Sequence, residues 1–319
     1  MRDATTFGPD TTADQTLEGL DLTGRAILVT GGSSGLGAES ARALAARGAE
    51  VILTARDVAK GEDVAAAIRR GTGNPDVSVA SVELASLASI RAFAERFLAA
   101  HPRLDVLLAN AGVMACPLAH TADGFEMQLG TNHLGHFLLT GLLLPALRRG
   151  TRARIVSVSS RGHHIAPVDF DDPHFARRPY DKWQAYGQAK TANVLFAVGL
   201  ERRLAPHGIH AFALHPGAIM TELARHLVPE DITFLRSRGG SGGLRFKTVE
   251  AGAATSVFAA TAPELDGRGG LYLEDCHVAA VNDAPDALDG VKSYAIDPAL
   301  AERLWTLSEA AVGQRIAVG

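Results

Sequence analysis

The sequence predicts an α/β fold with a doubly wound parallel sheet, formed as a single domain. Short apolar runs alternate with helical patterns along most of the chain, and a glycine-rich turn follows the first apolar run. Strands separated by helices of about ten or more residues pair in parallel through right-handed crossovers. The glycine-rich and polar motifs then fall at the carboxyl ends of strands, where ligands bind in such sheets.

The individual elements follow from apolar runs and from the residues that bound them. Strands are expected at 26–30, 51–55, 77–82, 106–108, 155–158 and 209–214. Helices are expected at 35–47, 58–68 and 87–100, in a long region up to 149, and around Tyr186. Asp57 and Ser86 are placed to cap the second and third of these helices.

The domain organisation is simple. Residues 1–21 form a polar extension, and 22–319 form one catalytic domain with no linker or internal repeat. The segment 222–247 differs because it is rich in Arg and Gly and follows the last strand expected to contact a cofactor. We expect this segment to be a flexible C-terminal lid over a substrate.

The composition narrows the classes of function. The 319 residues are 47% hydrophobic and 21% charged, with a net charge of −4, which gives no reason to expect nucleic acid as a partner. The polar N-terminus predicts no secretory signal, and no apolar run reaches the ~18 residues of a membrane span. Cys116 and Cys276 lack metal-type spacing, so we expect reduced, half-buried thiols, no metal site and a cytoplasmic location.

The first strand leads into a candidate dinucleotide loop. Glycines at such a turn let the backbone approach a pyrophosphate, which the free N–H groups of the following helix bind. A purely structural glycine turn is the alternative. The expected contacts are Gly31, Ser33, Ser34, Gly35, Leu36 and Gly37.

The end of the second strand indicates which dinucleotide binds. An acid there would hold the ribose 2′-hydroxyl of NAD, but the sequence has Ala55 followed by Arg56. A guanidinium pairs with a 2′-phosphate, so NADP(H) is favoured over NAD(H), unless Arg56 is only a solvated surface residue. Glu83 and Leu84 follow the third strand and are placed to meet the adenine.

A Tyr and a Lys one helical turn apart are the candidate catalytic pair. Tyr186 lies four residues before Lys190, whose ammonium would lower the phenol pKa towards the working range, together with an oxidised nicotinamide. Lys190 can also hold the nicotinamide ribose. Ser160, at the end of the fifth strand, would hydrogen-bond the substrate oxygen.

Three further residues have open assignments. Asn132 could order a water that connects Lys190 to solvent, although a buried Asn that bridges helices is the alternative. His163 and His164 follow Ser160 without an acid partner at a suggestive spacing, which favours loop or pocket-wall roles over proton transfer.

Together these motifs resemble the short-chain dehydrogenase/reductase family, which has a Rossmann fold. The resemblance covers residues from about 22 to 281 and implies Tyr186 as the acid/base. It also implies that residues at the end of the fourth strand contact the cofactor, together with a backbone group and a side chain in the segment after the sixth strand. The motif residues are Gly31, Gly35, Gly37, Asn110, Ala111, Gly112, Asn132, Ser160, Tyr186, Lys190, Pro216 and Gly217, with Ile219 and Thr221 expected to hold the carboxamide.

Longer strings are similar to the retinol dehydrogenase and WW-domain oxidoreductase branch of that family. They are 55–62, 121–127, 132–140 and 275–279. The branch implies NADP(H) and an apolar aldehyde, ketone or secondary alcohol. The chain departs from it in having no N-terminal apolar anchor and in the Arg- and Gly-rich composition after Thr221. The family also implies that long helices pair between subunits, which would make the protein a homo-oligomer. The apolar run 137–147, taken alone, fits a buried core as well as a subunit interface.

Two other functions remain as alternatives to this enzyme. A nonenzymatic NADP(H)-binding redox sensor would have lost a catalytic residue, but all four are present. A sugar-nucleotide epimerase or dehydratase would need a different glycine spacing and a larger C-terminal domain.

Overall fold

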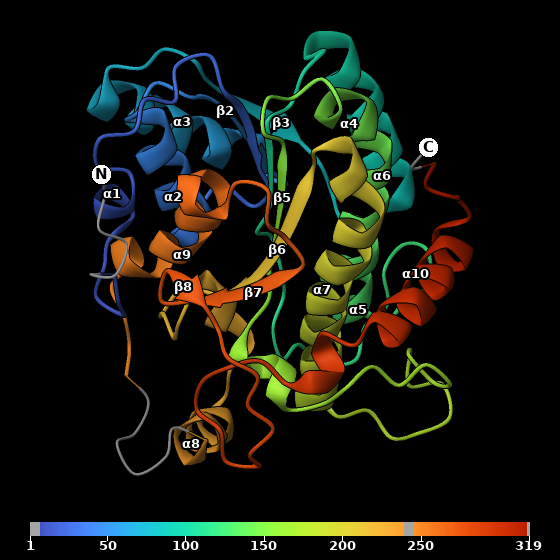
Figure 1. Cartoon of the computed structure of the whole chain (residues 1–319). Coiled ribbons are helices and arrows are strands. Elements are labelled where there is room, and N and C mark those ends of the chain that lie inside the picture. The colour runs from blue at the N-terminus through green and yellow to red at the C-terminus, as the bar shows by residue number, and fades with distance from the viewer. Residues whose placement is uncertain (1–6, 239–244, 318–319) are drawn as a thin grey trace.

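The computed structural model of the chain describes residues 7–238 and 245–317. Its described residues form one eight-stranded sheet in the order β3-β2-β1-β4-β5-β6-β7-β8, with only β8 antiparallel to its neighbour (Figure 1). The strands are β1 (Ala26–Val29), β2 (Glu50–Ala55), β3 (Val77–Ser81), β4 (Val106–Ala109), β5 (Arg154–Val158), β6 (His210–His215), β7 (Leu271–Glu274) and β8 (His277–Val278). The doubly wound parallel sheet that the sequence predicts is confirmed.

The sheet order reverses at β1, which lies between β2 and β4. Leu28 in β1 pairs with Ile52 on one side and with Leu107 on the other. Chain segments leaving β1 and β4 therefore diverge to opposite sides of the sheet, and a crevice opens at their carboxyl ends.

Helices cover both faces of the sheet, as Figure 1 shows. Ile27 and Val29 point to the face covered by α1, α2, α3 and α9, whereas Leu28 points to the face covered by α4, α6, α7 and α10. The helices are α1 (Ala13–Thr16), α2 (Gly35–Ala45), α3 (Val58–Thr72), α4 (Leu87–Ala100), α5 (Met127–Leu129), α6 (Gly135–Leu147), α7 (Lys182–Leu204), α8 (Pro229–Ser237), α9 (Val249–Thr261) and α10 (Pro298–Val312). Shorter turns of helix are η2 (Gly130–Leu134), η3 (Arg161–His164), η4 (Ala205–His207), η5 (Glu222–His226), η6 (Pro263–Leu265) and η7 (Ser293–Ala295).

The two predicted helix caps are confirmed. The Asp57 side chain accepts a hydrogen bond from the Lys60 N–H, and the Ser86 side chain accepts one from the Ser89 N–H. Helix α3 continues four residues beyond the predicted end, to Thr72, where Gly73 at φ 72° terminates it in the left-handed region.

The apolar run from Phe137 to Leu147 is core. It lies in α6, and most of its side chains are buried against α4, the sheet and α10 of the same chain. Within the described ranges, no helix is long and apolar enough to cross a bilayer.

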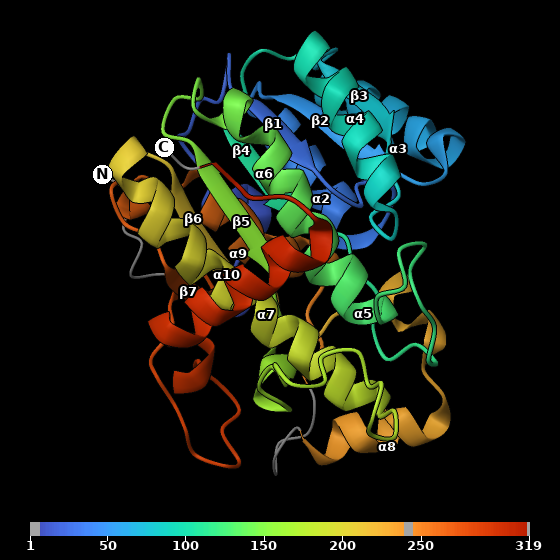
Figure 2. The same ribbon diagram turned by 90° about the vertical axis from the view of Figure 1, so that its right-hand side faces the viewer.

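The C-terminal third contains elements that the sequence patterns did not predict. Strand β7 extends the sheet beside β6, α9 packs against α1 and α2, and α10 packs along α7, as Figure 2 shows from the side. Residues near the N-terminus also contribute, since Ala13 and Leu17 belong to the core cluster that α9 covers. Short strands and an Ala-rich helix carry weak periodicity, so their formation depends on the neighbours that bury them.

Candidate active site

A cavity of about 720 Å³ opens at the carboxyl ends of the strands, at the crevice beside β1. Its walls come from the β1–α2 turn, the ends of β2, β3, β4 and β5, the helix α7, and the segment after β6. It is lined by Gly31, Ser33, Ser34, Gly35, Leu36, Gly37, Arg56, Glu83, Leu84, Asn110, Ala111, Gly112, Ser160, Tyr186, Lys190, Pro216, Gly217, Ile219 and Thr221. Of the catalytic and cofactor-binding residues selected from the sequence, only Asn132 does not line this cavity.

The β1–α2 turn is too tight for side chains at its glycines. Gly31 has φ 67°, and a Cβ built on Gly37 would lie 2.3 Å from the Gly31 carbonyl oxygen and 2.6 Å from Asn110 Nδ2. Asn110 Nδ2 in turn donates to the Thr30 carbonyl over 2.9 Å, which ties the turn to the end of β4. The glycines are therefore required by the close approach of two strand ends.

The first turn of α2 presents unoccupied N–H groups to the cavity. Its N-cap residue, Ser34, makes no side-chain hydrogen bond to the helix, and no acidic side chain lies in the first turn. A helix N-terminus without a cap carries partial positive charge and free donors, which suit a phosphate. The turn and the helix start together fit the pyrophosphate of a dinucleotide.

The residue after β2 is an exposed arginine with one weak ion pair. Arg56 lines the cavity, its side chain is 66% exposed, and its only ion pair in the described structure is with Glu83 at 3.8 Å. Such an exposed pair contributes little free energy, about 0–1 kcal/mol, so a 2′-phosphate could replace it. Leu84 lies beside them in the cavity wall.

Tyr186 and Ser160 meet at the other end of the cavity. Tyr186 is buried on α7, and the Ser160 side chain hydrogen-bonds its phenol. Gly162 allows this approach, because a Cβ there would lie 2.6 Å from Tyr186 Cε1 and 3.3 Å from Ser160 Oγ. The Gly162 N–H also donates to Ser160 Oγ over 2.9 Å and so fixes the hydroxyl.

Burial controls both pKa values in the Tyr186–Lys190 pair. It raises the pKa of Tyr186 to about 12, and the hydrogen bond from Ser160 opposes this only in part. Burial also lowers the pKa of Lys190 to about 8. The sequence predicted a lowered phenol pKa through Lys190. In the cofactor-free protein desolvation raises that pKa instead, with Lys190 Nζ 5.7 Å from the Tyr186 ring centroid, so the lowering expected with Lys190 and an oxidised nicotinamide together stays a prediction for the complex.

Asn132 lies behind the cavity wall on a turn of π-helix, η2. Its side chain accepts a hydrogen bond from the Val113 N–H at 2.8 Å and donates to the Val113 carbonyl at 2.9 Å. A Cβ built on Gly112 would lie 3.0 Å from Asn132 Oδ1 and 3.7 Å from Lys190 Nζ, so the two side chains converge behind Gly112. Isolated π-turns are common at functional sites, because they redirect one side chain.

The segment 222–247 carries a helix, α8, whose apolar side faces the site. Leu227, Phe234 and Leu235 pack with Trp183 and Tyr186 of α7. The composition of this segment suggested only arginines and glycines, and its glycine-rich part, 239–244, lies outside the described residues.

An aspartate anchors α8 to the start of α7, and sequence analysis missed it. Asp231 is buried, pairs with Lys182 Nζ at 2.6 Å and accepts from Trp183 Nε1 at 3.0 Å. The partners are almost 50 residues apart in the chain, a separation that no spacing rule detects.

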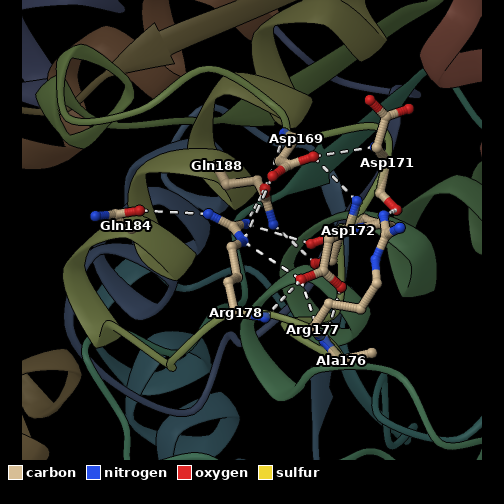
Figure 3. A network of polar contacts seen from close by, with 9 residues as sticks. Asp169, Asp171, Asp172, Ala176, Arg177, Arg178, Gln184 and Gln188 are labelled. Atoms are coloured by element: carbon tan, nitrogen blue, oxygen red, sulfur yellow. Dashed lines mark hydrogen bonds and ion pairs between the residues drawn. The ribbon is translucent and has the colours of Figure 1, made fainter.

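A second polar network holds the loop before α7, as Figure 3 shows. The Asp172 carboxylate accepts from the backbone N–H groups of Ala176, Arg177 and Arg178. Arg178 also donates to Gln188 Oε1 at 3.1 Å, two residues after Tyr186 on α7. The loop is thereby tied to the turn of α7 that carries the tyrosine.

The histidines after Ser160 support the site from outside the cavity. His163 is buried, its Nδ1 lies 2.7 Å from the Ser160 carbonyl oxygen, and burial lowers its pKa to about 3. Neither His163 nor His164 lines the cavity, and no three His, Cys, Asp or Glu side chains gather as metal ligands in the described ranges. Cys116 and Cys276 are both buried, rather than half-buried as expected.

Comparison with known proteins agrees with this geometry. Residues 25–231 match the family model for short chain dehydrogenase. A "Probable oxidoreductase" of Streptomyces lividans is 48% identical over 90% of this chain and 97% of its own length. Human retinol dehydrogenase 11 is 43% identical over 91% and 86%. A crystal structure from Mycobacterium paratuberculosis superposes with a TM-score of 0.72 at 35% identity, covering 95% and 98%. The chain therefore belongs to the short-chain dehydrogenase family of NAD(P)-binding oxidoreductases.

Proposed function

We propose that this protein is an NADP(H)-dependent oxidoreductase that interconverts a carbonyl compound and an alcohol, with Tyr186 as the general acid/base. One observation carries the proposal. Tyr186, Ser160 and Lys190 line the same cavity as the dinucleotide turn, so a cofactor and a small substrate can meet there. A nonenzymatic sensor would have no need for this grouping.

The residues have separate tasks in this proposal. A bound reduced nicotinamide supplies the hydride for the carbonyl carbon. Ser160 holds the carbonyl oxygen beside Tyr186, which gives that oxygen its proton. A phenol with a pKa of about 12 is fully protonated at neutral pH, so it can donate its proton to the substrate oxygen. The site must then stabilise the phenolate that remains.

Lys190 supplies that stabilisation. Its pKa of about 8 leaves it mainly charged at neutral pH, close to the developing phenolate and to the ribose position. Asn132 and Lys190 converge behind Gly112, which supports a role for Asn132 in the proton path. Pro216, Gly217, Ile219 and Thr221 line the same cavity and would hold the carboxamide of the nicotinamide.

Arg56 supports NADP(H) as the cofactor. The Arg56→Ala variant should raise the KM for NADPH about 10–100-fold, the value of one or two charge-assisted hydrogen bonds, and change the KM for NADH much less. Arg70→Ala is a matched control, since Arg70 is exposed on α3 and away from the cavity. Equal effects on both cofactors would refute the assignment to NADP(H).

The substrate end of the cavity is largely apolar, which supports an apolar aldehyde, ketone or secondary alcohol. Met114, Ile165, Leu227 and Leu235 line it around Tyr186. The relative named a retinol dehydrogenase makes retinal a reasonable test compound.

The test is NADPH consumption with a panel of apolar aldehydes and ketones, with retinal included and Tyr186→Phe measured in parallel. We expect carbonyl-dependent turnover that the variant loses while NADPH binding stays within about threefold, since the phenol oxygen touches the reacting atoms and not the adenosine end. A variant that keeps most of its rate would refute the role of Tyr186. If NADPH binds but neither carbonyls nor, with NADP⁺, the corresponding alcohols react, the enzyme assignment is wrong.

A further inference from the structure

The substrate end of the cavity contains arginines that the proposed function does not use. Arg161, from the turn directly after Ser160, lines the cavity, as do Arg236 and Arg238 from the end of α8. Three cations from two separate segments thus line the cavity that also holds Tyr186. An uncharged substrate would offer these arginines no anionic partner.

These arginines have no carboxylate partner. Arg161 donates to the Leu288 carbonyl at 3.3 Å, and Arg238 lies 5.8 Å from the Phe234 ring centroid. Among the described residues, none of Arg161, Arg236 and Arg238 has a carboxylate oxygen within 4.0 Å, whereas many arginines elsewhere in the chain do. The nearby Glu274 accepts from the Gly290 N–H instead.

The acids of the cavity lie elsewhere and are occupied. Glu83 pairs with Arg56, and Glu222 pairs with Lys60 at 2.6 Å. Both belong to the side of the cavity that would hold the dinucleotide. Within the described lining, the substrate end is therefore cationic without compensation.

Arg161 and Arg238 are close enough for their charges to interact. Burial lowers the pKa of Arg161, and the charge of Arg238 lowers it further, although Tyr272 and Glu274 oppose this. Like charges brought together in a partly buried wall cost free energy, and an anion placed between them would recover it.

We propose that the physiological substrate carries an anionic group, a carboxylate or a phosphate, which Arg161 and the arginines of the lid bind while the carbonyl lies at Tyr186. The inference rests on the proposed function and refines its substrate class, from apolar to amphipathic. The apolar residues around Tyr186 contact the body of the substrate, and the arginines contact its charged end. A guanidinium binds either anion through paired N–H groups.

The experiment compares aldehydes that carry an anionic group with neutral analogues built on the same ring. NADPH-dependent reduction of 4-formylbenzoate is measured against its methyl ester, and that of 4-formylphenyl phosphate against 4-methoxybenzaldehyde. We expect kcat/KM to favour at least one anion over its neutral partner by about tenfold or more, with the difference mainly in KM and reduced at high ionic strength. The stronger of the two preferences identifies the anion.

Variants connect the preference to the arginines. Arg161→Met and Arg238→Met should each lower kcat/KM for the preferred anion about tenfold and leave the neutral aldehyde within about twofold. Arg238→Lys, which keeps the charge, should restore part of the loss, and Arg70→Met should change neither substrate. Arg238 is exposed, so its variants test the idea even if Arg161→Met fails to fold.

The outcomes separate the two proposals. Equal rates for charged and neutral aldehydes, or a preference that survives both Met substitutions, would overturn the anionic substrate and leave the carbonyl reductase standing. If no aldehyde of either kind is reduced, the proposed function fails and the refinement fails with it.

Discussion

Replacing Lys190 by Met should make the cofactor-free protein more stable while removing its activity. Lys190 is only 3% exposed, and its pKa falls from 10.5 to about 8 because burial disfavours the charge. That shift corresponds to about 3 kcal/mol of unfavourable free energy in the folded state. Met has a similar length and no charge, so it fills the site without the desolvation cost.

One loss offsets part of this gain. Lys190 Nζ donates to the Val158 carbonyl at 2.9 Å, a hydrogen bond that contributes about 1 kcal/mol. The Val158 carbonyl keeps a second donor in the variant, because Asn193 Nδ2 lies 3.1 Å away. We therefore expect Lys190→Met to raise the free energy of unfolding by about 2 kcal/mol at pH 7.

The pH dependence distinguishes this cause from a packing effect. Between pH 8 and 10.5 the unfolded chain binds more protons at this lysine than the folded chain does, so wild-type stability rises with pH through that window relative to the variant. The advantage of Lys190→Met should be complete well below pH 8, vanish at about pH 9.5 and become a deficit of about 1 kcal/mol above 10.5, where only the lost hydrogen bond remains.

Urea unfolding of both proteins from pH 7 to pH 10 measures this difference. Lys60→Met is the control, since Lys60 is exposed and its ion pair with Glu222 contributes little. A Lys190→Met protein that is less stable than wild type at pH 7, or a difference that does not shrink with pH, would show that the ammonium is better solvated than its burial implies.

Three further substitutions test the turn, the lid and the chemistry. Gly37→Ala places a Cβ 2.3 Å from the Gly31 carbonyl oxygen, so it should lower the free energy of unfolding by about 1–3 kcal/mol and weaken NADPH binding. Urea unfolding and NADPH titration measure these two effects. Gly71→Ala is the control, because Gly71 has open space around it and the change should be neutral or stabilising. Asp231→Asn breaks the ion pair with Lys182, so it should raise the substrate KM and make α8 more susceptible to proteolysis. Glu230→Gln is the control. Unchanged cleavage would mean that the apolar contacts alone hold the lid. Tyr186→Phe should keep the stability of the wild type within about 1 kcal/mol, because its ring still packs on Trp183, so a lost activity could not be attributed to unfolding.

The motifs of the N-terminal two thirds could be predicted from the sequence because their signals are local. A strand, a glycine turn and a helix start are adjacent in the chain, and Tyr186 and Lys190 are one helical turn apart. The caps at Asp57 and Ser86 are equally local, and both are present.

The features that the sequence did not predict depend on contacts between segments that are distant in the chain. Strand β7 is only four residues long and exists because β6 offers it a parallel partner. The burial that raises the pKa of Tyr186 in the cofactor-free protein is likewise not revealed by any spacing. The same holds for the anchor between Asp231 and α7.

The sequence by itself determined the doubly wound sheet, the candidate dinucleotide turn and the choice of catalytic candidates, because the signal for each comes from residues that are neighbours in the chain. Only the tertiary structure decided that α8 packs against Tyr186, that burial sets the two pKa values, and that Arg161 lines the same cavity as Arg236 and Arg238. Those properties depend on desolvation and on contacts between distant segments, and both exist only once the chain has folded.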